Sequence, residues 1–267
     1  MSADLLGAYD AQLRARMPER LPAGVTVERD GPLVRWVGFA HRGFVTYRDL
    51  AGLDGGALDE LIARQVGLFA GRGEAFEWKL HGHDLPADLA ERLTAAGFVP
   101  EPVETVMIAR VAGIAGPARL PEGVALRRVM TRQDYDRIAA METRVWGDGA
   151  STLSAMLAGE HAADPDALTV VVAAAGEDVV CAGWIRYEER SEFATLWGGA
   201  TLPAWRGRGI YRALVAHRAN LAAARGFRYL EVDASDESRP ILARLGFAAV
   251  TTTTPYVWSP SAPARAR

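Results

Sequence analysis

A short segment rich in arginine and glycine, directly before an expected helix, has the residue types that bind an anion. The segment Arg206-Gly207-Arg208-Gly209 follows a strand that Pro203 ends. The first backbone N–H groups of a helix lack partners within the helix, and the helix dipole adds partial positive charge there. The glycines let the chain turn tightly and let a phosphate approach without a Cβ in its way. The arginines, Arg212 included, add charge beside these N–H groups, so the segment predicts a phosphate site.

Three kinds of phosphate loop are compatible with such a junction, and two of them fail here. A dinucleotide loop needs a third glycine where Arg212 stands. A Gly-Lys-Ser/Thr loop is excluded because Lys79 is the only lysine and does not follow a glycine-rich turn. The segment resembles the pyrophosphate loop of the GNAT superfamily of acyl-CoA-dependent N-acyltransferases, whose pattern is Arg/Gln-x-x-Gly-x-Gly/Ala after a strand ending in Val-x-Pro. Here Thr201-Leu202-Pro203 precedes the loop, and Tyr211 replaces its last small residue.

The resemblance extends from about Val124 to Trp258 and includes the strand Tyr229–Asp233 and a helix that ends before Gly246-Phe247. It implies a mixed α/β (α+β) sheet whose fourth and fifth strands splay apart around acetyl-CoA, the acyl donor. It also implies a β-bulge at Gly198-Gly199 and a backbone N–H near Thr201 that stabilises the tetrahedral oxyanion. The donor-binding residues that it implies are Gly199, Thr201, Arg206, Gly207, Arg208, Gly209, Ile210, Tyr211, Arg212 and Ser235.

Amine acylation needs a base, because an alkylammonium group with a pKa of about 10 is not a nucleophile at neutral pH. Many GNAT members carry a glutamate on the fourth strand, where this chain has Thr195. Others use the glutamate of a Leu-Glu-Val fifth strand, which is present as Glu231. Strand alternation places Asp233 on the same face. We therefore expect Glu231 to be the base and Asp233 the second candidate; the alternative interpretation is that both are solvated carboxylates at a strand end.

The tyrosine that usually serves GNAT members as general acid is absent. Leu242 stands at its position, four residues before Gly246. Tyr256 on the last strand, Tyr211 or a bound water are the substitutes, and Tyr256 is the residue that we assign. Tyrosines at such positions more often only pack.

Three residues are candidates for binding the acceptor. Trp197 shares a strand face with Thr195 and Thr201. Glu142 and Trp146 lie near the junction of the first two helices of the unit, where GNAT members build the acceptor site. The alternatives are a core tryptophan and an ordinary i,i+4 pair on a helix.

His81-Gly82-His83-Asp84 has one feature of a metal site, because His-x-His on a strand directs both rings to one side. No further histidine or cysteine lies nearby in sequence, so we predict no metal. The motif Gly-x-Ser-x-Gly is absent, which leaves an esterase without support.

Composition restricts the class of protein. Of the 267 residues, 49% are hydrophobic and 24% charged, which excludes a disordered or collagen-like chain. The net charge of −3 gives no general attraction to nucleic acid or anionic lipid. No apolar run is long enough for a membrane helix, and we expect no signal peptide because no basic region followed by an apolar core opens the sequence. The single cysteine, Cys181, fits a cytoplasmic protein, and no motif marks it as a nucleophile.

The chain divides into two halves at Val111–Gly123, a segment rich in Gly, Ala and Pro. Both Glu77–Phe98 and Tyr229–Phe247 follow the order strand, turn, helix, Gly-Phe, which favours an internal duplication. We expect a degenerate GNAT-like domain at 1–111, a linker at 112–123, an acyl-CoA-binding GNAT domain at 124–258 and a flexible tail at 259–267.

These features predict an N-acetyltransferase that moves an acetyl group from acetyl-CoA to a primary amine without a covalent intermediate. The acceptor, a small molecule or a peptide, is open, and so is the choice between monomer and homodimer. One alternative is a non-catalytic module that senses acyl-CoA, favoured by Thr195 and Leu242. Another is an acyltransferase that uses a longer acyl donor.

Overall fold

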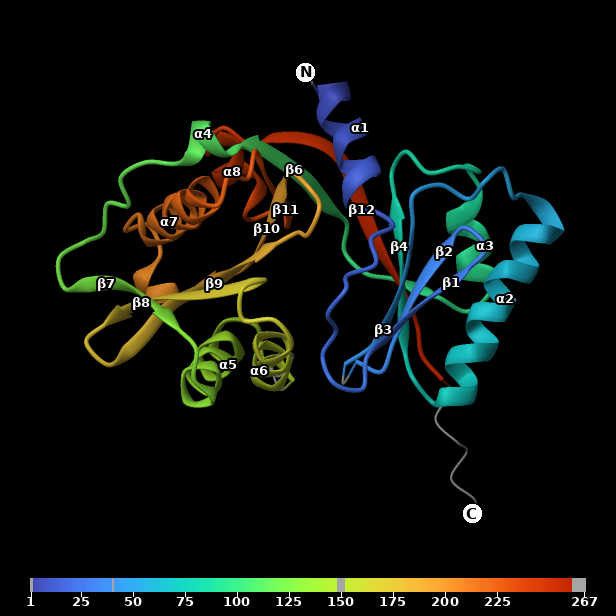
Figure 1. Cartoon of the computed structure of the whole chain (residues 1–267), viewed down its shortest axis with the longest axis horizontal. Helices are drawn as coiled ribbons and strands as arrows, with labels where there is room; N and C mark the ends of the chain where they lie inside the picture. The colour runs from blue at the N-terminus through green and yellow to red at the C-terminus, as the bar shows by residue number, and fades with distance from the viewer. Residues whose placement is uncertain (1, 40, 148–151, 261–267) are drawn as a thin grey trace, which may run out of the picture.

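Figure 1 shows the order of the strands and helices along both halves of the chain. The computed structural model describes residues 2–39, 41–147 and 152–260; of the expected tail, residues 261–267 lie outside this part. The first half contains α1 (Ser2–Gln12), β1 (Thr26–Asp30), β2 (Leu33–Val37), β3 (Gly43–Tyr47), α2 (Gly55–Arg72), β4 (Phe76–His81), α3 (Leu89–Ala95), β5 (Val99–Pro100) and β6 (Glu104–Arg110). The second contains α4 (Val111–Ile114), β7 (Val124–Val129), α5 (Arg132–Trp146), α6 (Leu153–Ala163), β8 (Leu168–Ala175), β9 (Asp178–Tyr187), β10 (Phe193–Thr201), the 3₁₀ turn η2 (Pro203–Trp205), α7 (Ile210–Ala224), β11 (Tyr229–Ala234), α8 (Arg239–Leu245) and β12 (Ala248–Trp258).

The two halves share one sheet because they exchange strands. The order is β1-β2-β3-β4-β12-β6-β11-β10-β9-β8-β7, and β5 pairs with β12. The last strand of the chain, β12, therefore lies between two strands of the first half, and β6 of the first half pairs with β11 of the second. Figure 1 shows β6 and β12 crossing the middle of the molecule between the two lobes. Hydrogen bonds along these strands tie the halves together.

The same strand arrangement occurs once in each half, where two parallel strands pair over a short length. In the second half β10 and β11 pair only from Phe193↔Tyr229 to Thr195↔Glu231 and then separate. In the first half β3 and β4 pair only from Gly43↔Phe76 to Val45↔Trp78. The predicted splay of the central strands is confirmed, and the repeated arrangement agrees with the expected duplication.

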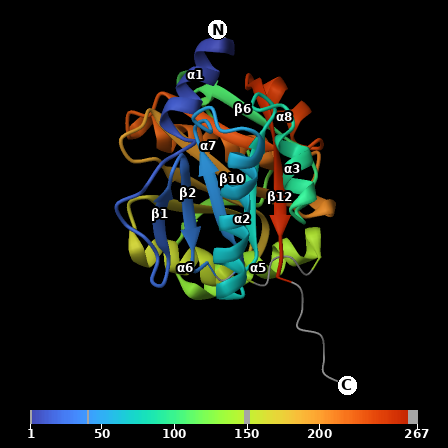
Figure 2. The same ribbon diagram turned by 90° about the vertical axis from the view of Figure 1, so that its right-hand side faces the viewer.

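Helices cover the sheet with apolar faces of helical spacing. On α2 the buried residues are Leu58, Leu61, Ile62, Gln65 and Phe69, which repeat every three or four positions. Figure 2 shows α2 and α3 on the outer face of the first half. In the second half, α5 and α6 cover one face and α7 and α8 the other (Figure 1).

The segment between the halves is not a free linker. Its start forms α4, which packs on α7. The side chain of Asn220 on α7 then accepts a hydrogen bond from the N–H of Gly116 and donates one to its carbonyl, each of 2.9 Å. These two hydrogen bonds hold the Gly- and Pro-rich segment against the helix.

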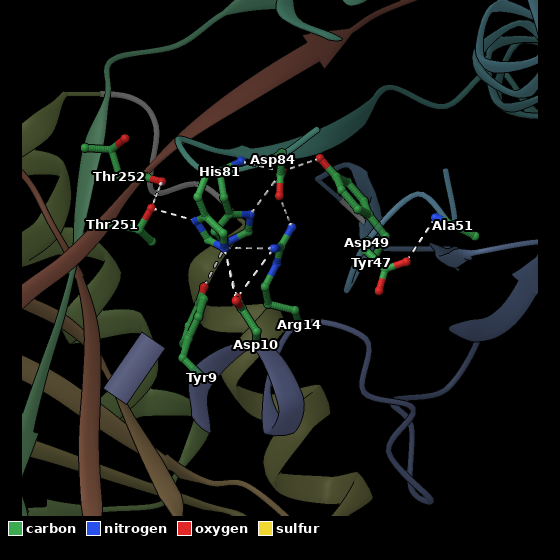
Figure 3. Close-up of polar contacts among 11 residues, drawn as sticks. Tyr9, Asp10, Arg14, Tyr47, Asp49, Ala51, His81, Asp84, Thr251 and Thr252 are labelled. Carbon is green, nitrogen blue, oxygen red and sulfur yellow. Dashed lines mark hydrogen bonds and ion pairs between the residues drawn. The ribbon is translucent and has the colours of Figure 1, made fainter. Parts of the chain in front are cut away.

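The residues near His81 anchor α1 to the sheet through a buried polar network (Figure 3). The Tyr9 hydroxyl and His81 Nε2 lie 2.9 Å apart. The Asp84 carboxylate accepts hydrogen bonds from Arg14 Nη2 and the Tyr47 hydroxyl, both at 2.6 Å, and from the His81 N–H at 2.8 Å. His83 bonds instead with Asp10, at 3.1 Å. Among the described residues no group of three or more His, Cys, Asp or Glu side chains could hold a metal ion.

Replacing Asp84 with Asn will destabilise the fold in a pH-dependent way. Burial opposes ionisation of Asp84, but hydrogen bonds from His81 and the charge of Arg14 lower its pKa from 3.8 to about 2. A depressed folded pKa contributes stability that is present above the unfolded pKa and is lost as pH falls through the folded one. We expect Asp84→Asn to cost about 2 kcal/mol at pH 7 and almost nothing near pH 2.

Urea unfolding at several pH values measures this loss. The exposed Asp178, the first residue of β9, provides the matched control Asp178→Asn. A destabilisation by Asp84→Asn that stays constant from pH 7 to pH 2 would contradict the ionic role of the carboxylate.

Candidate functional site

The splay between β10 and β11 opens into a large cavity that both halves of the chain line. Its volume is about 1680 Å³. Trp36, Phe44 and Lys79 line it from the first half, and Trp197 and Glu231 from the second. One open cavity is thus lined by the predicted phosphate loop, the predicted base and side chains of the other half.

The predicted phosphate loop has the backbone geometry of an anion site. Gly207 and Gly209 adopt φ values of 74° and 80°, the left-handed region that glycine tolerates. α7 starts directly afterwards, and no side chain caps its N-terminus. Of the six loop residues expected to bind the donor before Arg212, all but Arg208 line the cavity, as does Arg212. Arg208 instead stacks on the Trp205 ring, 4.8 Å from its centroid, so the structure does not bring it to the cavity.

The expected β-bulge lies at the edge of the cavity beside this loop. The register of β10 and β9 shifts between Gly198 and Thr201, and Gly198 and Gly199 adopt φ values of 66° and 100°. A Cβ on Gly199 would lie 2.7 Å from the Tyr211 ring. The absence of a side chain at 199 therefore makes room for Tyr211, the residue that departs from the loop pattern.

A buried arginine on α7 forms hydrogen bonds to the backbone beside the bulge. Arg218 on α7 is only 1% exposed. Its Nη1 donates hydrogen bonds to the carbonyl of Trp197 at 3.0 Å, directly before the bulge, and to that of Trp184 at 3.1 Å, which pairs with Trp197 on β9. Within the described part of the chain it forms no ion pair with a carboxylate. Burying a charge without an ion pair costs free energy, and Arg218 bears this cost where it forms hydrogen bonds beside the bulge.

Thr201 ends β10 at the cavity, and its hydroxyl donates to Cys181 Sγ at 3.1 Å. Burial raises the pKa of the Cys181 thiol to about 11. The thiol is therefore protonated at neutral pH, which agrees with its lack of a nucleophile motif. Ser235, also on the cavity wall, accepts a hydrogen bond from the Ser238 N–H before α8.

The predicted base lies in a cluster of charges that comes from three strands. Glu231 is 6% exposed, and burial together with the neighbouring Asp233 raises its pKa well above 4.5. Asp233 forms an ion pair with Lys79 of β4. Burial disfavours the ionised form of Asp233, but the Lys79 charge outweighs it and lowers the pKa. Strand exchange thus places a cation of the first half beside Asp233, and of the two carboxyl groups on β11 it is Glu231 whose pKa is raised.

Glu104 on β6 is a third carboxyl in this cluster. Burial, then the charge of Asp233, raises its pKa to about 7. It lines the cavity with Glu231. A proton acceptor near neutrality is the requirement for a general base at physiological pH.

The structure does not bring Tyr256 to the site. It pairs with Trp78 across the β12–β4 ladder, and its ring packs against the core of the first half. Because β12 crosses into the first half, a residue expected beside Glu231 lies outside the cavity lining. This position does not support the assignment of Tyr256 as the general acid, which stays a prediction.

The three expected acceptor residues all line the cavity. Trp146 and Trp197 are 60% and 42% exposed, so neither is a core tryptophan. Trp197 Nε1 donates to the Thr195 hydroxyl at 2.8 Å, and this hydroxyl donates to Glu188 at 2.7 Å. Glu142 is buried, and its Oε1 has no hydrogen-bond partner.

Comparison with known proteins agrees with this geometry. Residues 132–247 match the acetyltransferase (GNAT) family. This part of the chain is a GNAT acetyltransferase domain. The match supports acyl transfer in general as the chemistry of this part of the chain. No curated protein matches the sequence.

Solved structures extend the likeness of fold to the whole chain. A GCN5-related N-acetyltransferase from Kribbella flavida is 15% identical, with 98% of this chain and 95% of that chain covered and a TM-score of 0.66. A tandem GNAT protein from the clavulanic acid biosynthesis pathway is 14% identical, with the same coverage and a TM-score of 0.64. A functionally unknown protein from Staphylococcus epidermidis is 11% identical, with 90% and 96% covered and a TM-score of 0.67. At these identities the likeness concerns the fold alone, and it includes the first half.

Sequence reasoning missed three groups that the structure places around the GNAT domain's cavity. Lys79 and Glu104 belong to the first half, and Arg218 lies on a helix without any motif. The one signal for Lys79 was its being the only lysine of the chain.

No helix of the described residues is long and apolar enough to cross a membrane.

Proposed function

We propose that this protein transfers an acetyl group from acetyl-CoA to a primary amine by direct attack. The observation that carries the proposal is the meeting of an uncapped helix N-terminus, a glycine bulge and the buried Glu231 in one cavity. The first supplies a place for the pyrophosphate, the second for the thioester carbonyl and the third for the proton of the amine. The N-terminal unit at 1–111 completes the acceptor side and leaves donor binding to 124–258.

The donor lies between β10 and β11, with its pyrophosphate at the N–H groups that begin α7. Arg206 and Arg212 contribute charge to this end of the cavity. The thioester carbonyl points at a backbone N–H of the bulge, whose peptide groups are held in place by Arg218. The N–H···O hydrogen bond strengthens as negative charge develops on the carbonyl oxygen, which stabilises the tetrahedral intermediate.

Glu231 takes a proton from the acceptor ammonium and frees the nitrogen lone pair. The nitrogen attacks the carbonyl carbon, so that an N–C bond forms and the carbonyl electrons move to oxygen. Collapse of the intermediate breaks the C–S bond, and the second nitrogen proton passes to the CoA thiolate through water. The products are the acetamide, CoA thiol and one proton held by Glu231, which is released to solvent.

Replacing Gly209 with Glu will abolish tight binding of the donor. The side chain would place a carboxylate where the pyrophosphate must lie, so we expect the Kd of acetyl-CoA to rise at least about 100-fold. Calorimetric titration with acetyl-CoA, CoA and NAD⁺ measures this, and the wild type should bind the first two and not the third.

Gly226 at the end of α7 offers a matched control. Its φ of 79° equals that of Gly209 within a degree, and a Cβ there meets nothing within 4 Å. Gly226→Glu therefore carries the same backbone strain without approaching the cavity, and should keep wild-type affinity. If Gly209→Glu binds acetyl-CoA as tightly as Gly226→Glu, the loop is not the phosphate site.

A further inference from the structure

Trp197 stands on β10 between the glycine bulge and the end at which the splay closes. β10 and β11 pair only through residues 193–195 and 229–231, and they separate beyond that point. Trp197 follows two residues later, lines the cavity and is 42% exposed. The bulge comes directly after it, and the phosphate loop lies farther along the chain. From the open end of the splay to the closed end, the order is therefore loop, bulge and Trp197.

This order bears on where the acyl group of a bound donor ends. In the proposed reaction the pyrophosphate lies at the start of α7 and the thioester carbonyl at the bulge. An acyl chain that continues in the same direction runs away from the loop, toward the closed end of the splay. The side chain of β10 that it meets directly beyond the bulge is Trp197. Each further methylene group brings the chain closer to this indole.

The edge of the indole is fixed by a row of polar contacts. Trp197 Nε1 donates to the Thr195 hydroxyl at 2.8 Å, and this hydroxyl donates to Glu188 Oε1 at 2.7 Å. Thr195 is only 5% exposed, and its one hydroxyl hydrogen is used in this row. The other oxygen of Glu188 forms an ion pair with Arg16, which follows α1 in the first half. A charged residue of the first half is thus linked through two side chains to Trp197.

The face of the indole is held as well. The Arg186 guanidinium lies over the Trp197 ring, 4.4 Å from its centroid, in a cation–π contact. Glu160 on α6 accepts two hydrogen bonds from this guanidinium, at 2.7 Å from Nε and 2.8 Å from Nη2. A bidentate pair of this kind fixes both the position and the orientation of the guanidinium. The ring therefore has a fixed edge and a fixed face, and the rest of it is open to the cavity.

We propose that Trp197 limits the acyl group of the donor to a short chain. The ring blocks a chain that continues past the bulge, and its two attachments keep it from moving aside. Arg16 is a positioning residue that holds the indole through Glu188 and Thr195. This inference rests on the proposed function and adds the selectivity among donors. It also moves Trp197, expected from the sequence at the acceptor, to the acyl group.

Calorimetric titration with CoA, acetyl-CoA, butyryl-CoA and hexanoyl-CoA tests this limit without any acceptor. Where an acyl chain has room to be buried, each methylene group tightens binding about fourfold. For the wild type we expect the opposite, with a Kd for hexanoyl-CoA at least about tenfold above that for acetyl-CoA. A wild-type Kd that falls steadily from acetyl-CoA to hexanoyl-CoA would overturn the proposal.

Replacing Trp197 with Ala removes the block. We expect the ratio of the hexanoyl-CoA Kd to the acetyl-CoA Kd to fall at least about 30-fold, while the Kd of CoA stays unchanged. Trp36→Ala removes an indole that lines the cavity from β2 of the first half, and it should keep the wild-type ratio. A wild-type ratio in Trp197→Ala, or the same change in both variants, would overturn the proposal.

Thr195→Val and Arg16→Gln test the positioning of the ring. Thr195→Val keeps the shape of the side chain and removes both hydrogen bonds of its hydroxyl. We expect each variant to lower the ratio about three- to tenfold, with the indole still present and the Kd of CoA unchanged. Arg190→Gln is the matched control, because the ion pair of Arg190 with Glu19 joins the same two segments through other residues. If Arg16→Gln behaves like Arg190→Gln, Arg16 has no positioning role.

The same titrations separate this inference from the proposed function. If neither CoA nor any of the thioesters binds, the proposed function fails, and the role of Trp197 fails with it. If the thioesters bind but the ratio does not respond to Trp197→Ala, donor binding stands and only the limit on the acyl group fails. If Trp197→Ala lowers the ratio as expected, both stand.

Discussion

Replacing Glu231 with Gln will lower the rate of acetyl transfer by about 10²- to 10⁴-fold, the usual contribution of a positioned base. The variant keeps the shape of the side chain and loses only the ability to accept the amine proton. The Kd of acetyl-CoA should not change, because the phosphate loop and bulge lie on other residues. Steady-state rates with an amine acceptor, beside calorimetric titration of the donor, measure the two effects separately.

The pH dependence of the acetyl-transfer rate gives a second test of Glu231 as the base. A base must be deprotonated, and burial with the neighbouring Asp233 raises the pKa of Glu231 well above 4.5. The wild-type rate should therefore fall with decreasing pH well above the range in which an ordinary glutamate titrates. Because Glu231 and Asp233 interact, the apparent pKa belongs to the cluster. The residual rate of Glu231→Gln should lose this dependence.

The exposed Glu122, before β7, gives the control Glu122→Gln, which should retain the wild-type rate. If Glu231→Gln transfers acetyl groups at the wild-type rate from pH 6 to pH 9, another group is the base. If donor binding is tight but no amine is acetylated even by the wild type, the alternative of an acyl-CoA sensor gains support.

Features that depend on consecutive residues were predictable from the sequence. The loop, its glycines and the start of α7 lie within a few residues, so local pattern alone places them. The helix expected directly after Arg206-Gly207-Arg208-Gly209 begins at Ile210. The position of Glu231 on a strand beside the splay follows from alternation along a single strand.

Features that depend on which strands pair were not predictable in this way. A strand's pattern of apolar residues fixes its faces but not its neighbours, and β12 and β6 each have a compatible partner in either half. The exchange places Tyr256 beside β4 of the first half, outside the cavity lining, and brings Lys79 and Glu104 to the cavity wall. Arg218 is missed for a related reason, because an arginine on a helix is ordinarily exposed.

Replacing Lys79 with Met will destabilise the protein by about 3 kcal/mol at neutral pH, since removing one partner of a buried ion pair leaves the other uncompensated. This is the low end of the usual range for breaking a buried ion pair, because the side chains of Lys79 and Asp233 are still 22% and 13% exposed. Urea unfolding measures the loss. The pH profile of acetyl transfer gives a second readout, because the Lys79 charge lowers the pKa of Glu231 and its removal should shift the acid limb to higher pH.

The double variant Lys79→Met/Asp233→Asn tests whether the cost comes from the charge or from lost packing. It removes both members of the pair, so most of the lost stability should return. The deficit of the single variant should also shrink as pH falls below 3.8, the ordinary pKa of Asp233, because the wild type then loses the contribution of the ionised carboxylate. A deficit that persists in the double variant and at low pH would mean that Lys79 acts through its packing. A deficit that disappears in both would mean that the strand exchange supplies the active cluster with its only lysine as a counterion.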